Sequence, residues 1–313
     1  MNALLHYLRE YFRDVHKGVL AASSLSTGLL VWCNYRYGLN NEIYQSGENI
    51  TSFARQYLLF LFALVSPYLF CFLLAGKNYF RSPVFVLLLL LSPAIFSWKV
   101  GFREDWQISA DPAWNDYWNQ VLHWPACSLG LILSLLIVWL IFYRNEAFFG
   151  ITWKHFQSMP YVWLILLMVP LVAAASTQDD FLQLYPRVQE VSGALANTPA
   201  KWRYQILFEL SYGSNFITIE LFFRGFLVLA FARYAGSNAI LPMACFYCTI
   251  HFGKPLGECI SSYFGGILLG IVVYHTRSIL GGLMVHLGIA WMMELGAFLG
   301  HAALRDSICV VSG

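Results

Sequence analysis

The chain has 313 residues, of which 58% are hydrophobic and 12% are charged, and its net charge is +2. A soluble globular domain carries about 25% charged residues, so this composition excludes an ordinary soluble protein and indicates an integral membrane protein. The small net charge and the lack of a basic run give no reason to expect nucleic acid as a partner. The seven cysteines lie mostly within apolar runs, which favours small apolar side chains over a disulfide framework.

Apolar runs along the chain predict an all-α, polytopic bundle of membrane-spanning helices. A span needs about 20 largely apolar residues. An amphipathic lead-in over residues 2–15 precedes the first run, and no cleavage site of small residues follows that run, so we expect it to stay uncleaved. The runs predict about nine spans, or eight if two of them merge, at 18–36, 56–76, 82–99, 126–143, 160–176, 206–232, 238–252, 257–275 and 279–299.

Two polar loops interrupt these runs and suggest the domain organisation. The loop 100–124 is rich in tryptophan and should lie along the membrane surface, because indole rings favour the headgroup layer. The loop 177–203 separates an N-terminal block of about five helices, residues 1–200, from a C-terminal helix bundle at 201–302, with a tail at 303–313.

The distribution of Lys and Arg predicts the orientation. Short basic segments alternate with longer loops in which basic residues are sparse. Cytoplasmic loops are enriched in Lys and Arg, so we expect the N-terminus in the cytoplasm. We expect the protein in the inner membrane of a bacterial cell, with the lipid bilayer as its surroundings.

Four ionisable residues fall inside the apolar runs of the last third of the chain: Glu220, Arg224, His251 and His286. An ionisable residue in a bilayer core is costly and marks a functional site by default. Counting from the nearest basic turns at about 1.5 Å per residue places all four roughly 14–20 Å from one membrane face. The hydrocarbon core is about 30 Å thick, so three helices should bring the four residues to a similar depth near its middle.

Other polar and small residues of this region have simpler interpretations. By the same count Glu258 and Glu294 lie near the opposite surface, where we expect their carboxylates to reach water. Ser262, Gly266 and Gly270 are spaced four residues apart, a pattern that lets two membrane helices approach closely.

The four intramembrane residues allow several kinds of chemistry. Glu220 and Arg224 are four residues apart on one helix face, so one interpretation is a buried ion pair that fixes helix packing. With two histidines at the same depth, Glu220 could instead accept a proton from water while the histidines orient it or stabilise an oxyanion. Two His and one Glu also form a known zinc set, although Arg224 beside Glu220 opposes a cation. A proton relay in a transporter is a further alternative, which the lack of an internal repeat disfavours.

Three segments resemble, in order and spacing, the motifs of the CPBP family (CAAX protease and bacteriocin-processing, or Abi), a family of intramembrane proteases. The family pattern reads Glu-Glu-x-x-x-Arg, then aromatic-x-x-x-His, then His-x-x-x-Asn. In this chain the corresponding segments are 219–224, ending in Phe-Arg-Gly at 223–225, then 247–251, and then 286–290. The first Glu of the pattern is Ile219 here, and the closing Asn is Ala290.

The resemblance implies an intramembrane endopeptidase that uses an activated water to hydrolyse a peptide bond in or beside the membrane. It implies Glu220 as the base or water-orienting carboxylate, His251 as its partner, His286 as the oxyanion donor and Arg224 as the positioning ion pair. It further implies a glutamate-dependent reaction without a cofactor, with zinc dependence as the less favoured mechanism. The substrate would be a membrane-associated peptide or protein, prenylated or bearing a leader.

The two replaced positions support a second hypothesis. Glu220 corresponds to the Glu that the Arg holds, and an ion pair with Arg224 would make it a poorer base. Losing one oxyanion donor typically costs about 10²–10³ in rate. The alternative is therefore a catalytically silent relative that binds peptides or partners, as in immunity to a secreted peptide.

Overall fold

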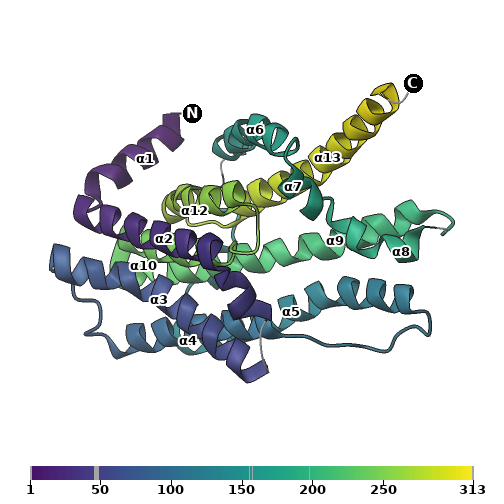
Figure 1. Ribbon diagram of the computed structural model, residues 1–313. Coiled ribbons are helices and arrows are strands. Elements are labelled where there is room, and N and C mark those ends of the chain that lie inside the picture. Colours follow the sequence, from purple (N-terminus) through teal and green to yellow (C-terminus); the bar gives the residue numbers. More distant parts are fainter. Residues whose placement is uncertain (1, 46–48, 155, 157, 197, 312–313) are drawn as a thin grey trace. The chain divides into compact units, whose positions relative to one another are not determined.

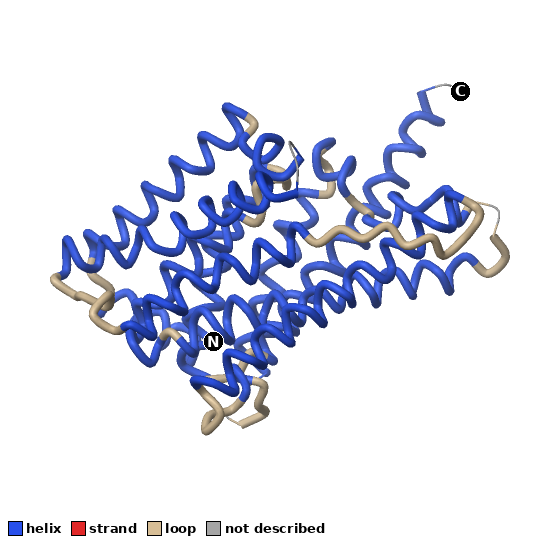
Figure 2. The backbone as a smooth tube through the Cα atoms, turned by 90° about the horizontal axis from the view of Figure 1, so that it is seen from below, coloured by secondary structure: helices blue, strands red, loops and turns tan. Residues whose placement is uncertain are grey.

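The computed structural model describes residues 2–45, 49–154, 156, 158–196 and 198–311. Within this part of the chain every regular element is a helix, which Figures 1 and 2 show. Seven helical stretches among the described residues are long and apolar enough to cross a membrane: Ile50–Ala75, Pro83–Gly101, Pro112–Phe142, Ser158–Ala175, Lys201–Thr249, Leu256–Thr276 and Leu280–Ala302. The prediction of an all-α, polytopic membrane bundle is confirmed.

The count of seven differs from the predicted nine for two reasons. The helix α2, Lys17–Tyr37, has the length of a span but carries several serines and an asparagine, so its mean hydropathy is lower than that of the other stretches. Two predicted spans, 206–232 and 238–252, fall within the one helical stretch Lys201–Thr249. That stretch consists of α9 (Lys201–Glu220), η4 (Leu221–Ala230), α10 (Ala232–Ala235), η5 (Gly236–Ala239) and α11 (Ile240–Thr249).

Local sequence signals set several helix ends. The side chain of Ser82 accepts a hydrogen bond from Phe85 N at 3.3 Å and, with Pro83 in the first turn, starts α4 (Pro83–Gly101). Gly38 ends α2 in the left-handed conformation, with φ of 67°, and its N–H donates to Asn34 O at 2.8 Å.

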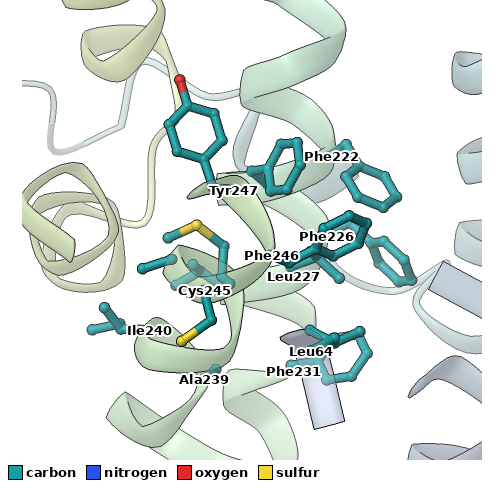
Figure 3. Close-up of a cluster of buried hydrophobic side chains, with 14 of the residues drawn as sticks. Leu64, Phe222, Phe226, Leu227, Phe231, Ala239, Ile240, Cys245, Phe246 and Tyr247 are labelled. Carbon is teal, nitrogen blue, oxygen red and sulfur yellow. The ribbon is translucent and has the colours of Figure 1, made fainter. Parts of the chain in front are cut away.

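The helices group into two compact units, and the first comprises residues 1–102, 129–156 and 218–282. It contains α1 (Asn2–Asp14), α2, α3 (Asn49–Ala75), α4, the end of α5 (Pro112–Phe142), η4, α11 and α12 (Leu256–Thr276). Its core surrounds α11, whose ten residues are all buried (Figure 3). Aromatic rings join the elements there: Phe246 of α11 lies 4.7 Å from Phe60 of α3, and Phe222 of η4 lies 4.9 Å from Phe96 of α4, measured between centroids.

The second unit comprises residues 103–128, 157–217 and 283–313. It holds the first half of α5, α6 (Ser158–Ala175), α7 (Asp179–Leu184), η3 (Arg187–Val191), α8 (Ser192–Leu195), most of α9 and most of α13 (Leu280–Val311). Its largest apolar cluster joins α5 to α9, and the hydroxyl of Tyr117 donates to Tyr204 O at 2.8 Å.

The structure corrects part of the prediction for the tryptophan-rich segment. We expected residues 100–124 to lie along the membrane surface, but α5 begins at Pro112 and runs without a break to Phe142. Trp114, Trp118 and Trp124 therefore lie on a helix, where Trp114 stacks edge-on against Tyr204 of α9 with centroids 4.9 Å apart. The assignment of residues 112–124 to a loop is wrong, because the polar residues between the tryptophans hid the continuation of the helical pattern. The location along the membrane surface stays a prediction.

The small-residue stripe on α12 packs as predicted. A methyl group at Gly266 would lie 3.3 Å from the Cα of Ala244, and one at Gly270 would lie 2.8 Å from Met243 Cε. Both neighbours belong to α11, so the stripe lets α12 pack close to the core helix of the first unit.

A π-helix directly follows Glu220, the last residue of α9, in the core. η4 spans ten residues, Leu221–Ala230, directly after Glu220, and nine of its ten side chains are buried. Gly225 in its middle lies against Phe149, since a methyl group there would be 2.5 Å from Phe149 O. Wide π turns are rare in proteins and occur frequently at functional sites.

Candidate active site

The centre of the candidate site is an ion pair between Glu220 and Arg224. Arg224 Nη1 lies 3.2 Å from Glu220 Oε1, and both side chains are fully buried. The helical stretch that contains them is apolar enough to cross a membrane. The predicted pairing four residues apart is confirmed. A buried pair of this kind carries a large desolvation cost, so its presence requires close partners on every side.

Tyr247 of α11 links the ion pair to His251. The guanidinium carbon of Arg224 lies 4.1 Å from the centroid of the Tyr247 ring, a cation–π contact. The same ring meets the imidazole of His251 edge-on at 4.7 Å. The aromatic residue of the second motif therefore contacts both Arg224 of the first motif and His251 of its own motif.

The protonation of His251 follows from its backbone contact. Nδ1 of His251 lies 2.9 Å from Tyr247 O, one helical turn earlier. A carbonyl oxygen only accepts hydrogen bonds, so Nδ1 carries the proton. In the neutral ring the lone pair is then on Nε2, which is the nitrogen able to take up or relay a proton.

Gly282 provides the space that Glu220 occupies. A methyl group at this position would overlap Oε2 of Glu220. The carboxylate therefore lies between Arg224 of its own helix and the backbone near the start of α13. Sequence reasoning missed Gly282, because a glycine 62 residues away from Glu220 carries no local signal of this contact.

The loop that follows α11 and carries His251 is held by the N-terminal block. The side-chain amide of Asn34 donates to Phe252 O at 2.9 Å, and the hydroxyl of Tyr35 donates to Lys254 O at 2.5 Å. Both donors lie near the end of α2. Sequence reasoning also missed them, although a buried asparagine at the end of an apolar run is the kind of signal that points to a specific partner.

His286 lies in the second unit, on α13. Its imidazole stacks against Phe216 of α9 with centroids 4.6 Å apart and an interplanar angle of 52°. The inclusion of His286 in the site rests on the third motif alone.

The two positions at which the chain departs from the family pattern are apolar and buried. Ile219 belongs to the large core of the first unit, and Ala290 belongs to the cluster that joins α5, α9 and α13 in the second unit. Neither side chain carries a polar group.

The prediction that Glu294 reaches water is wrong. Its side chain is 5% exposed, and its Oε1 and Oε2 accept from the backbone N–H of Arg187 at 3.1 and 2.9 Å. Glu294 lines a cavity of about 310 Å³ in the second unit together with Glu209, Trp202 and Trp291. Glu258 forms an ion pair with Lys254 at 3.7 Å and is 19% exposed, closer to the expectation of an interfacial carboxylate.

Among the described residues, no group of three or more His, Cys, Asp or Glu side chains has the geometry to hold a metal ion. The site as described consists of a carboxylate, a guanidinium, an aromatic ring and an imidazole, which together suit proton transfer and charge stabilisation.

Comparison with protein families identifies the class of the C-terminal region. Residues 202–292 match the family described as type II CAAX prenyl endopeptidase Rce1-like. The match contains Glu220, Arg224, His251 and His286, and it confirms the resemblance to the CPBP family that the three motifs indicated. This stretch is CAAX protease-like and lies within an integral membrane protein. Searches of curated proteins and of solved structures found no match.

Proposed function

We propose that this protein is an intramembrane endopeptidase, which hydrolyses a peptide bond in or next to the membrane with an activated water. The observation that carries the proposal is the match of residues 202–292 to a family of CAAX endopeptidases, with the motif residues inside the matched stretch. The contacts of Tyr247 with Arg224 and His251 support it, because they connect two motifs that are far apart in sequence.

In this mechanism Glu220 and His251 activate the water together. Either Glu220 accepts the proton of the water, or Glu220 orients the water while His251 Nε2 accepts the proton. The resulting hydroxide attacks the carbonyl carbon of the scissile peptide bond. His286 donates a hydrogen bond to the oxyanion that forms. The proton then passes, through His251 Nε2 or Glu220, to the leaving amine. General acid–base groups of this kind typically contribute about 10²–10⁴ in rate.

Arg224 acts as a positioning residue. Its guanidinium holds one oxygen of Glu220 at 3.2 Å and rests on the ring of Tyr247. Because Glu220 and Arg224 are both fully buried, a peptide would reach the carboxylate only after the surrounding helices open. Closure of the helices around the bound peptide would then commit the substrate and exclude bulk water from the reaction.

The proposed substrate is a membrane-associated peptide or protein, because the candidate site lies on helices that can cross a bilayer. The proposed location is the inner membrane of a bacterial cell with the N-terminus in the cytoplasm. Reporter fusions to residue 1 and to the loop near residue 178 test this orientation, and an N-terminus on the outer face would overturn it.

A catalytically silent relative that binds peptides is the second candidate function. Ile219 and Ala290 are the observation that favours it, since both are apolar and buried where the family pattern has polar groups. Such a protein would keep the peptide-binding bundle and lose the reaction.

One assay separates the two functions. The purified protein is incubated in detergent or nanodiscs with a library of membrane-tethered peptides, beside Glu220→Gln, His251→Ala and His286→Ala. Controls are Glu146→Gln and His6→Ala, which alter exposed residues outside the motifs. Endopeptidase function predicts cleavage that all three site variants lose and both controls keep.

Two other outcomes would contradict the proposed endopeptidase or its mechanism. If the parent binds peptides without cleaving any, and the three variants bind as it does, the silent function replaces the protease. A chelator arm tests the zinc-dependent mechanism: loss of cleavage that zinc restores would overturn the glutamate-dependent reaction proposed above.

A further inference from the structure

Two buried cysteines flank the loop that carries His251. Cys248 lies in the last turn of α11, and Cys259 lies in the first turns of α12. Their Sγ atoms are 3.9 Å apart, and both side chains are buried. The sequence suggested small apolar side chains at these positions.

The two side chains face each other reciprocally. Cys248 Sγ lies 3.4 Å from Cys259 O, and Cys259 Sγ lies 3.8 Å from Cys248 O. A disulfide has an S–S distance of about 2.05 Å, so each sulfur must move by only about 1 Å. Movement of this size is within reach of side-chain rotation between two neighbouring helices. We propose that Cys248 and Cys259 are a modification site, at which oxidation forms a disulfide that closes the loop around His251.

A groove gives an oxidant a route to this pair. In the first unit a cavity of about 600 Å³ opens beside α2 and α12, and its lining includes Cys248, Tyr35, Leu256 and Tyr263. Cys259 is not part of that lining. The side chains of both cysteines are fully buried, so a small apolar disulfide in the groove reaches Cys248 when local opening of α2 and α12 exposes its sulfur. Cys259 lies behind Cys248 and completes the exchange.

The reaction balances as a thiol–disulfide exchange with a small-molecule disulfide as the oxidant. The thiolate of Cys248 attacks one sulfur of the oxidant, which breaks the S–S bond and releases one small thiol. The thiolate of Cys259 then attacks Cys248 Sγ and expels the second small thiol. The protein loses two electrons and two protons, and the two released thiols carry them.

The disulfide would restrict the segment that the proposed function needs to move. Asn34 and Tyr35 already hold this loop from the side of α2. A second attachment at its two ends would leave His251 little freedom while the helices open around Glu220. This consequence rests on the proposed endopeptidase function, whereas formation of the disulfide does not.

The test uses 4,4′-dithiodipyridine on the full-length protein in detergent, in a Cys33→Ser/Cys309→Ser background. Peptide mapping under non-reducing conditions should find residues 248 and 259 linked, with a mass lower by two hydrogens and two thiopyridones released per link. Dithiothreitol should reverse the link. Hydrogen exchange of the amides at 250–254 should be slower in the oxidised form than in the reduced form.

Single variants test the order of events. Cys259→Ser should stop at one pyridyl adduct on Cys248, and Cys248→Ser should leave Cys259 unmodified. Cys245→Ser, which alters a buried cysteine one turn away on the same helix, should still form the link. Unlinked pyridyl adducts on both cysteines, or a link that appears only after denaturation, would overturn the proposal.

The peptide-cleavage assay measures separately whether the disulfide changes activity. If the protein cleaves peptides, oxidation should reduce cleavage, and dithiothreitol should restore it. A linked protein that cleaves as fast as the reduced form refutes the control of activity while the modification site stands. Absence of cleavage in both forms refutes the proposed function and leaves the mass measurement unaffected.

Discussion

Arg224 has a fully buried positive charge whose ion-pair partner is the fully buried carboxylate of Glu220, 3.2 Å away. We expect Arg224→Ala to destabilise the protein by about 3–5 kcal/mol, because removal of one member leaves an uncompensated buried charge. Thermal or denaturant unfolding in detergent, followed by circular dichroism, measures the change.

The matched control is Arg233→Ala. Arg233 pairs with Glu146 at 3.8 Å, and both side chains are 56% exposed. An exposed pair contributes about 0–1 kcal/mol, so this variant should unfold close to the parent. Equal losses in the two variants would mean that burial does not set the energetics of the Glu220–Arg224 pair.

Gly282→Ala tests the position of the carboxylate more finely. The new methyl group would overlap Oε2 of Glu220, which lies at the far end of a flexible side chain. The backbone can therefore stay in place while the carboxylate moves away from its position beside Arg224. A displacement of about 1 Å in a catalytic group costs on the order of 100-fold in rate.

We therefore expect Gly282→Ala to lower peptide cleavage about 100-fold while the protein remains folded. Gly265→Ala is the control, because a methyl group there meets no atom within 4 Å. Cleavage at the parental rate by both variants would show that Glu220 has room to adjust, and would weaken its assignment as the activating group.

Sequence reasoning reached some of these residues and missed others for a physical reason. The pairing of Glu220 with Arg224 was predictable, because a helix places residues four apart on one face. Gly282 and Asn34 were not, because their contacts with Glu220 and Phe252 join helices distant in sequence. The role of Tyr247 lay between these cases: the motif included it, and only the structure showed its contact with Arg224.

At the level of elements, hydropathy predicted most helices but not their internal geometry. The run at 206–232 read as one span, whereas the structure divides it into α9 and the π-helix η4. A π turn leaves no separate signature in apolar periodicity, since the whole segment is buried. Its cause lies in tertiary packing, where the short 3-10 helix η2 (Phe148–Gly150), with Phe149 at a left-handed φ of 42°, lies against Gly225.

Gly225→Ala tests this packing. A methyl group at position 225 would lie 2.5 Å from Phe149 O, and a backbone carbonyl cannot rotate away as a side chain does. The backbone at Phe149 and Gly150 is fixed further, because Ile279 N donates to Gly150 O at 3.0 Å. Overpacking of this kind typically costs about 1–3 kcal/mol.

We expect Gly225→Ala to lower the unfolding temperature, and we expect Gly257→Ala, where a methyl group meets no atom within 4 Å, to leave it unchanged. The same unfolding assay measures both. An unchanged unfolding temperature in Gly225→Ala would mean that the Phe149 segment can move aside, and that it does not hold η4 in place.

For the whole molecule, the N-terminal block gains a role that sequence alone left open. Asn34 and Tyr35 of α2 donate hydrogen bonds to the loop that carries His251. A further hydrogen bond, 3.0 Å long, joins the hydroxyl of Ser24 on α2 to the hydroxyl of Tyr263 on α12. The aromatic core around α11 includes Phe60 of α3. The division at residue 200 follows a polar loop, yet the packing of the first unit joins residues from both sides of it.

Asn34→Ala removes the hydrogen bond from α2 to Phe252 O. Phe252 O would lose its donor inside the core, and an unsatisfied buried polar group costs about 1–3 kcal/mol. Hydrogen exchange of the amides at 250–254 should accelerate, and peptide cleavage should fall. Arg36→Ala, an exposed residue at the same end of α2, is the control and should change neither quantity.

The same packing predicts that the family-matched region does not fold alone. A fragment of residues 201–302 lacks α2 and α3, which leaves one side of α11 without its apolar cover and the His251 loop without Asn34. In lipid the lost packing is not replaced by a hydrophobic driving force, so the helices have little reason to assemble in one arrangement.

In detergent the fragment should show helical circular dichroism without a cooperative thermal transition, whereas the full chain should show one. Co-expression with residues 1–200 as a separate chain should restore the transition and co-purify the two pieces. A cooperative transition in the fragment alone would show that residues 201–302 form an independent bundle and that the N-terminal helices serve another purpose.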